Sequence, residues 1–292
     1  MRGPLLASVT LTVGGVALAA CSLTTSLDGL SGSPAGDLPS SDGGGDTSTG
    51  DASLDDGSAP ADAADGALAS AYRAMVIADG PVAYYRLSDT GKSAKDEMGA
   101  HDGTYIGTLS HGPGAIAGDS DGALVANGQG WIDIAQVFPF TGNASYSIEA
   151  WVAPSPSATL TGILARNLAA PGSTPSDGYS LYIESPSLAP ILGRWRSSAE
   201  QSTAGPGLAA DKFSHVVGTY DGSTLRVYTN GILTGSAAAT QPIIAPAADL
   251  SIGATRNGTY GYFVGALDEI ALYDRVLPDD RIAAHHALGR GP

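Results

Sequence analysis

Two dipeptides that favour tight turns, Asp221-Gly222 and Asn230-Gly231, interrupt the most strand-like part of this chain. Asp or Asn followed by Gly accepts the positive φ angles that two-residue hairpin turns require. The residues on both sides are rich in Val, Thr and Tyr, which favour strands. Residues 213–236 therefore predict two consecutive hairpins, and consecutive hairpins require an antiparallel β-sheet.

Similar strand signals recur from residue 71 onward, as short runs of β-branched and aromatic residues bounded by Gly, Asp, Asn or Pro. The expected strands are residues 82–87, 131–134, 146–152, 179–183, 215–220, 225–228, 250–252 and 266–273. The chain has 40 Gly and 18 Pro but only 14 Lys plus Arg, so helix breakers are abundant. We expect an all-β fold with a single short helix, which begins at Pro278 and is closed by Gly289.

The five histidines show no spacing typical of metal ligands. His215 lies inside an expected strand and is predicted to be a half-buried structural residue. His285 and His286 fall near the end of the expected helix, where the helix dipole favours positive charge, and are predicted to be solvated.

The first twenty residues predict a secretory signal peptide. A positive start is followed by an apolar run from Leu5 to Ala17 that is too short to span a bilayer. Residues 18–21, Leu-Ala-Ala-Cys, resemble the bacterial lipobox, which implies cleavage before Cys21 and a diacylglycerol on its thiol. Cys21 is the only cysteine, and the alternative is a plain signal peptide with an incidental thiol.

Residues 21–70 are expected to form a disordered linker behind the lipidated cysteine. This stretch contains nine Asp and no Lys or Arg, and Ser, Gly, Ala, Thr and Pro fill most of the rest. The chain would contact a membrane through its lipid alone, and Ser22 favours the outer membrane or cell surface. The formal net charge of −15 argues against nucleic acid as a partner.

The run FSHVVGTYDGSTLRVYTNGILTGS closely resembles the central hairpins of laminin G-like jelly rolls in the concanavalin A-like superfamily. YSIEAWV, AYYRLSDTG with AKDEMGAHDGTYIG, and GALDEIALYDRVLPDDRIAAHH resemble further segments of that family. The resemblance covers almost all of residues 72–288. It implies an all-β, two-sheet antiparallel jelly-roll sandwich over residues 71–290 with a short C-terminal helix, and it places Trp151 in the core.

This superfamily contains lectins, adhesion modules and glycoside hydrolases, so the site must decide the function. Its hydrolases carry Glu-x-Asp-x-x-Glu or Glu-x-Asp-x-Glu on one strand, a spacing that this sequence lacks. Asp268 and Glu269 are adjacent and are expected on opposite faces of a strand. We predict a non-catalytic recognition or adhesion module that binds carbohydrate or a surface protein. A degradative enzyme with an unfamiliar carboxylate pair and a structural surface lipoprotein are the alternatives, and the oligomeric state stays open.

The resemblance also implies a calcium ion at the edge of the sandwich. Its expected ligands are Asp96, Gly99, Asp102 and Asp268, with an ordinary turn as the competing interpretation of Asp102. For a sugar ligand, we expect exposed aromatic rings that stack on a pyranose. Trp195, Tyr260 and Tyr262 lie in Gly-rich or charged contexts and are the candidates. Core packing is the competing interpretation of Trp195, because tryptophan is highly buried on average.

Overall fold

The computed structural model describes residues 71–158, 160–168, 177–255 and 258–291. The predicted signal peptide, Cys21 and the linker lie outside the described residues. None of the helices in the described part of the chain is long and apolar enough to cross a membrane.

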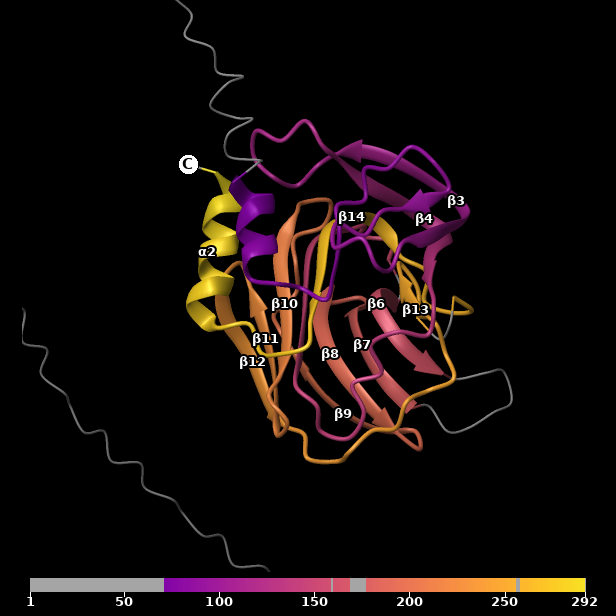
Figure 1. Cartoon of the computed structure of the whole chain (residues 1–292), viewed down its shortest axis with the longest axis vertical. Coiled ribbons are helices and arrows are strands. Elements are labelled where there is room, and N and C mark those ends of the chain that lie inside the picture. The colour runs from indigo at the N-terminus through magenta and orange to yellow at the C-terminus, as the bar shows by residue number, and fades with distance from the viewer. Residues whose placement is uncertain (1–70, 159, 169–176, 256–257, 292) are drawn as a thin grey trace, which may run out of the picture. The chain divides into compact units, whose positions relative to one another are not determined.

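Antiparallel strands make up most of the described structure (Figure 1). The strands are β1 (Ala83–Tyr85), β2 (Ser93–Ala94), β3 (Gly103–Pro113), β4 (Gly122–Ile134), β5 (Tyr146–Pro154), β6 (Thr161–Leu168), β7 (Asp177–Glu184), β8 (Ala189–Arg196), β9 (Ala199–Ala204), β10 (Ser214–Tyr220), β11 (Thr224–Thr229), β12 (Ile232–Ala238), β13 (Leu250–Ile252) and β14 (Val264–Tyr273). The helices are residues 71–78 and α2 (Asp279–Arg290).

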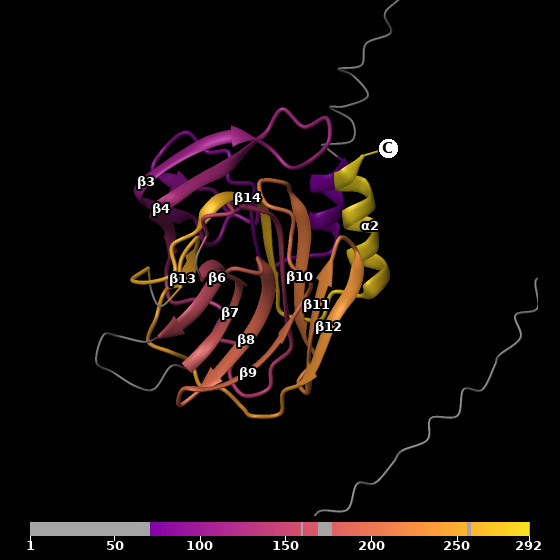
Figure 2. The same cartoon turned by 180° about the vertical axis from the view of Figure 1, so that it is seen from behind.

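The strands pair in the order β12-β11-β10-β5-β14-β4-β13-β6-β7-β8-β9. Strand β4 divides this path, because its first half pairs with β14 and its last residues pair with β13. We call β12, β11, β10, β5 and β14 the front sheet, and β13, β6, β7, β8 and β9 the back sheet. The two sheets face each other, with β11 and β12 against β8 and β9, and form a jelly-roll sandwich (Figures 1 and 2).

Two apolar cores flank the front sheet. The main core fills the space between the sheets, and β5 contributes Tyr146, Ile148, Ala150 and Val152 to it, as its alternation predicted. The second core lies on the opposite face, where the helix over residues 71–78 and α2 cover the sheet (Figure 1). Trp151 is buried there, so the prediction that it belongs to a core is confirmed.

The eight expected strands and both hairpin turns are present, and Asn230 and Gly231 have φ angles of 52° and 78°. The expectation of a single helix is wrong, since residues 71–78 form another. Helix α2 also continues past Gly289 and ends with Gly291 at φ 72°. Gly289 is needed for close packing instead, because a Cβ there would lie 2.5 Å from Cζ2 of Trp151.

The histidine predictions also need correction. His215 was expected to be half-buried and His285 to be solvated. Both side chains are fully buried. Their burial is possible because Glu149 Oε1 lies 2.7 Å from His215 Nε2 and 2.8 Å from His285 Nδ1. Asp79 Oδ2 pairs with the other ring nitrogen of His285 at 2.8 Å. His286 is half-buried and stacks on Trp151.

Candidate functional site

The outer face of the back sheet carries a row of polar and aromatic residues in register. Asn167 pairs with Gly178, Gly178 with Trp195, and Trp195 with Glu200, across strands β6, β7, β8 and β9. Alternate residues of a strand point to opposite faces, and the neighbouring Leu192 belongs to the main core. The side chains of this row therefore face away from the sandwich interior.

Trp195 lies flat on this surface because Gly193 has no side chain. A Cβ at Gly193 would lie 2.6 Å from Cη2 of Trp195 and 3.2 Å from Oε1 of Glu200. The indole and the Tyr182 ring have centroids 6.0 Å apart and planes inclined by 40°. The Tyr182 hydroxyl donates to Oε1 of Glu200 at 2.9 Å, so one carboxylate and two aromatic rings converge over one glycine.

These groups line a pocket of about 110 Å³, which we call the aromatic pocket. Its lining residues are Leu160, Asn167, Ser180, Tyr182, Trp195, Glu200 and Thr255. The hydroxyl of Ser180 is fully buried and has no hydrogen-bond partner. An unpaired buried hydroxyl is costly, so the pocket contains a polar atom that a ligand could satisfy.

A neighbouring hollow of about 300 Å³ extends the site. It is lined by Gly128, Leu160, Thr259, Tyr260, Gly261, Tyr262 and Val264, and Leu160 is common to both hollows. The structure thus brings the three predicted aromatic residues to adjacent pockets. Tyr260 is 49% exposed, whereas Tyr262 packs against Trp131 and donates from its hydroxyl to the Gly258 carbonyl at 2.8 Å.

Sequence reasoning missed Tyr182, Glu200 and Ser180. The β8–β9 hairpin that brings Glu200 opposite Trp195 turns at Ser197 and Ser198, whose φ angles are 52° and 67°. Two serines carry none of the Asn-Gly or Asp-Gly signal for such a turn. The period-2 alternation of residues 179–183 could have placed Ser180 and Tyr182 on the outer face.

Each of the four predicted calcium ligands makes hydrogen bonds within the protein. Asp96 accepts hydrogen bonds from the backbone N–H groups of residues 84, 98, 100 and 101. Asp102 binds Lys95 Nζ and the Asp96 N–H, and Asp268 accepts from Ala115 N at 2.7 Å. The Gly99 N–H donates to the Asp96 carbonyl at 2.8 Å. As arranged, these groups organise loops, and calcium binding through them stays a prediction.

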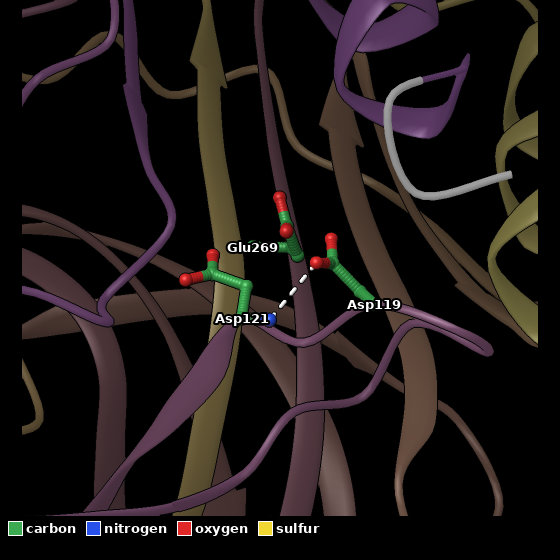
Figure 3. A group of neighbouring side chains, drawn as sticks. All are labelled: Asp119, Asp121 and Glu269. Carbon is green, nitrogen blue, oxygen red and sulfur yellow. Dashed lines mark hydrogen bonds between the residues drawn. The ribbon is translucent and has the colours of Figure 1, made fainter. Parts of the chain in front are cut away.

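A different acidic group does converge in the described part of the chain. Single carboxylate oxygens of Asp119, Asp121 and Glu269 lie within 4.8 Å of one another (Figure 3). Arg86 pairs with all three: Nη2 lies 2.9 Å from Asp121, Nε lies 3.1 Å from Glu269, and Nη2 also contacts Asp119. A guanidinium already supplies the cation here, so this group does not fit a metal ion as it stands.

Glu269 reaches this cluster through a β-bulge. The register of β14 shifts between Asp268 and Ala271, and Glu269 has a φ of 51°. Asp268 lies opposite Trp151 on β5, and Glu269 accepts a hydrogen bond from the Tyr84 hydroxyl. Trp151 and Tyr84 both belong to the second core, so the two carboxylates lie on the same side of the front sheet, and the expectation that they take opposite faces is wrong. Burial raises the pKa of Glu269 to about 7, even though Arg86 and the Tyr84 hydroxyl act to lower it.

Comparisons with known proteins agree with this architecture. A family model described as the concanavalin A-like lectin/glucanases superfamily (Laminin_G_3) matches residues 126–283. Domain 4 of AbnA, an extracellular GH43 arabinanase from Geobacillus stearothermophilus solved with arabinotriose, has a TM-score of 0.55 at 21% identity. That similarity covers 71% of this chain and 98% of the arabinanase domain.

Toxin binding domains are also similar in structure. The botulinum neurotoxin serotype G binding domain has a TM-score of 0.53 at 14% identity, covering 71% of this chain and 50% of that one. The neurotoxin DC binding domain in complex with SialylT has a TM-score of 0.53 at 12% identity, covering 73% and 52%. This chain thus spans about half the length of these two domains. No curated protein matches the chain in sequence.

Proposed function

The chain belongs to the concanavalin A-like lectin/glucanase superfamily, and on that premise we propose that the outer face of its back sheet binds carbohydrate without transforming it. The observation that carries the proposal is the half-buried Trp195 indole, which lies flat in the aromatic pocket between Glu200 and Tyr182. Aromatic faces stack on the apolar face of a sugar ring, and a few polar groups then fix its hydroxyls. Glu200 and Ser180 provide such groups.

The composition of the two hollows favours binding over catalysis. A glycosidase needs two carboxyl groups about 5 to 9.5 Å apart across the scissile bond. The residues that line the two hollows include one carboxylate, Glu200. Asp268 and Glu269, only 2% and 1% exposed, line neither hollow. Glu269 is paired with Arg86, and Asp268 accepts a hydrogen bond from Ala115 N. This arrangement supports a non-catalytic module over a hydrolase.

The similar solved structures support sugars as the ligand class. The arabinanase domain is described in complex with arabinotriose, and one toxin domain in complex with SialylT. Another toxin domain is described in complex with rat synaptotagmin II, so a surface protein is the second class of partner to test.

We place this module outside the cell. A lipid on Cys21 would hold the chain on a membrane through several acyl chains, at ~0.8 kcal/mol for each buried methylene. The Asp-rich residues 22–70 would separate the jelly roll from the membrane surface, since like charges extend a linker. The glycan would then be a polysaccharide or a glycan on a neighbouring surface.

The test is a glycan array probed with the Cys21→Ser chain and its Trp195→Ala variant. We expect the parent to bind a defined set of glycans, and Trp195→Ala to lose that binding while its melting temperature changes little, because the indole lies on the surface. Ile232→Ala is the matched control, since Ile232 is 68% exposed on β12 and lines neither hollow. Equal binding by Trp195→Ala and Ile232→Ala would contradict the proposal.

A further inference from the structure

We propose that the aromatic pocket selects sugars that carry a protonated amine, the 2-amino-2-deoxy sugars, over neutral and acetylated ones. This inference rests on the proposed carbohydrate binding and adds the class of sugar. The observation behind it is the placement of one carboxylate beside two aromatic rings in a hollow whose described lining contains no basic residue.

Among the described residues that line the aromatic pocket, Glu200 is the only ionisable acid or base other than a tyrosine hydroxyl. Its Oε1 is oriented by the Tyr182 hydroxyl at 2.9 Å, which positions the carboxylate beside the indole. Within the described residues, Oε2 has no hydrogen-bond donor and Glu200 forms no ion pair. A carboxylate oriented in this way offers an ammonium group a charge-assisted hydrogen bond.

The two rings add to the same preference. The faces of tryptophan and tyrosine attract a cation within about 6 Å of the ring centroid. The ring centroids of Trp195 and Tyr182 are 6.0 Å apart with planes inclined by 40°, and both residues line the pocket together with Glu200. The geometry gathers one carboxylate and two electron-rich rings in one pocket.

Among the described residues, no base that lines the pocket opposes this preference. Arg196 follows Trp195 in the chain, but its guanidinium pairs with Asp177 at 3.4 Å. The whole chain carries a formal charge of −15, so its long-range field also attracts cations. The carboxylate of an acidic sugar would be repelled by the carboxylate of Glu200. We therefore expect this pocket to exclude acidic sugars.

A sugar fits better than a lysine side chain. Ser180 lines the same pocket, and its hydroxyl is fully buried without a hydrogen-bond partner. A ligand hydroxyl or amine that reached this atom would supply the missing hydrogen bond. A lysine stem carries one polar head and would leave this atom unpaired. A pyranose with an amine carries several polar groups around a ring, and its apolar face matches the flat indole.

The experiment compares three oligosaccharides of equal length by isothermal titration with the Cys21→Ser chain: glucosamine, N-acetylglucosamine and glucose oligomers. It is run at a pH where the amine is protonated and at physiological ionic strength. We expect the glucosamine oligomer to bind about tenfold more tightly than the acetylated one, the scale of one desolvated cation–π or charge-assisted contact. The preference falls as pH rises through the pKa of the sugar amine.

Glu200→Gln removes the charge with almost no change of shape. We expect it to abolish the tenfold preference while binding of the neutral oligomers changes less than about twofold. The matched control is Glu184→Gln, which removes the same charge from an exposed position on β7 outside both hollows. Glu200→Lys is a second variant at this exposed site, and it should reject the amine and retain neutral sugar.

Equal affinities of the parent for the three oligomers would overturn the inference, as would equal effects of Glu200→Gln and Glu184→Gln. Tighter binding of a lysine-rich peptide than of the glucosamine oligomer would overturn it in favour of a protein ligand. Each of these three results would leave the proposed carbohydrate binding intact if Trp195→Ala abolishes the binding of neutral sugars. The proposed function itself fails if no oligosaccharide binds, or if Trp195→Ala binds sugars like the parent.

Discussion

At the residue scale, Gly193 decides where the Trp195 indole lies. Strand β8 presents Gly193 and Trp195 on the same face, two positions apart, and the absence of a Cβ lets the ring fold back onto the backbone. The ring then shares its surface with Glu200, its cross-strand partner on β9. A tryptophan at this position beside any larger residue would project into solvent.

Gly193→Ala should therefore impair binding more than stability. The added methyl would lie 2.6 Å from Cη2 of Trp195, so the indole must turn away from Glu200. We expect at least about a tenfold loss of glycan affinity and a small change in melting temperature. Gly91→Ala is the control, because its Cβ would meet nothing closer than the Ser93 nitrogen at 3.9 Å. Parent-like affinity of Gly193→Ala would contradict this role of the glycine.

Arg86 is a second residue whose removal should have a large effect. Arg86→Met would leave three buried or half-buried carboxylates without their cation, and breaking such a pair costs about 3 to 5 kcal/mol. Urea denaturation measures the loss. Arg226→Met is the comparison, since its pair with Asp221 is about a third exposed and worth about 0 to 1 kcal/mol. Equal losses in the free energy of unfolding for the two variants would show that the Arg86 ion pairs stabilise the fold no more than an exposed pair does.

Chelation tests the predicted calcium site. The carboxylates of Asp96, Asp102 and Asp268 bind N–H groups, and Arg86 supplies the positive charge to the converging acids, so we expect EDTA to leave the melting temperature and glycan affinity of the parent unchanged. A fall in either on chelation, reversed by calcium chloride, would establish a calcium ion in this protein.

At the element scale, helix α2 is held on the front sheet by charge as well as by apolar packing. Its Ile282 enters the second core, and its His285 bridges Glu149 on β5 and Asp79 after the first helix. Burial acts to lower the pKa of His285, but attraction and hydrogen bonds from Glu149 and Asp79 raise it above its usual value of 6.5. Burial acts to raise the pKa of Glu149, but His285 and His215 hold it well below 4.5.

These shifts predict how stability depends on pH. A raised histidine pKa contributes stability that is complete below about pH 6.5 and is lost as pH rises through the folded-state value. A lowered glutamate pKa contributes stability above about pH 4.5 and loses it as pH falls further. The contribution of these two residues to the free energy of unfolding should therefore be highest between these values and decline toward alkaline pH.

Urea titrations from pH 5 to pH 9 measure this decline. His285→Gln should remove most of the slope above pH 6.5, because glutamine keeps a polar group but cannot titrate. His111→Gln is the control, since His111 is exposed on β3. If the slope persists in His285→Gln, another group controls the alkaline loss.

At the scale of the whole molecule, the proposed function needs both a binding face and a place outside the cell. The two outer faces of the sandwich differ. The two helices cover the outer face of the front sheet (Figure 2). One face of the sandwich is thus closed by helices, and the other carries the aromatic pocket. A lipid at Cys21 would bring this face to the cell surface.

Cys21→Ser should abolish lipidation without affecting the jelly roll. We expect radiolabelled palmitate to enter the parent and not the variant, and the variant to leave the membrane fraction, because the thiol is the attachment point that the lipobox resemblance implies. Glycan affinity should be the same for detergent-solubilised parent and variant. Unchanged labelling of Cys21→Ser would refute the anchor.

Local patterns in the sequence were sufficient for the fold class. Turn dipeptides such as Asn230-Gly231 and the alternation in residues 146–152 act between near neighbours, so the strands and their inward faces follow from short segments. The all-β class and the candidate aromatic residue Trp195 could be named in this way, whereas the two-sheet jelly roll was implied by the resemblance of longer runs to the laminin G-like family. The family match over residues 126–283 agrees with that assignment.

Tertiary structure alone decided the neighbours of these residues. Glu200 faces Trp195 because two serines turn the β8–β9 hairpin, and Arg86 meets Glu269 because a bulge redirects a strand far along the chain. His285 is buried because Glu149 and Asp79 approach it from other elements. Such contacts depend on register and packing between distant segments, and no local period encodes them.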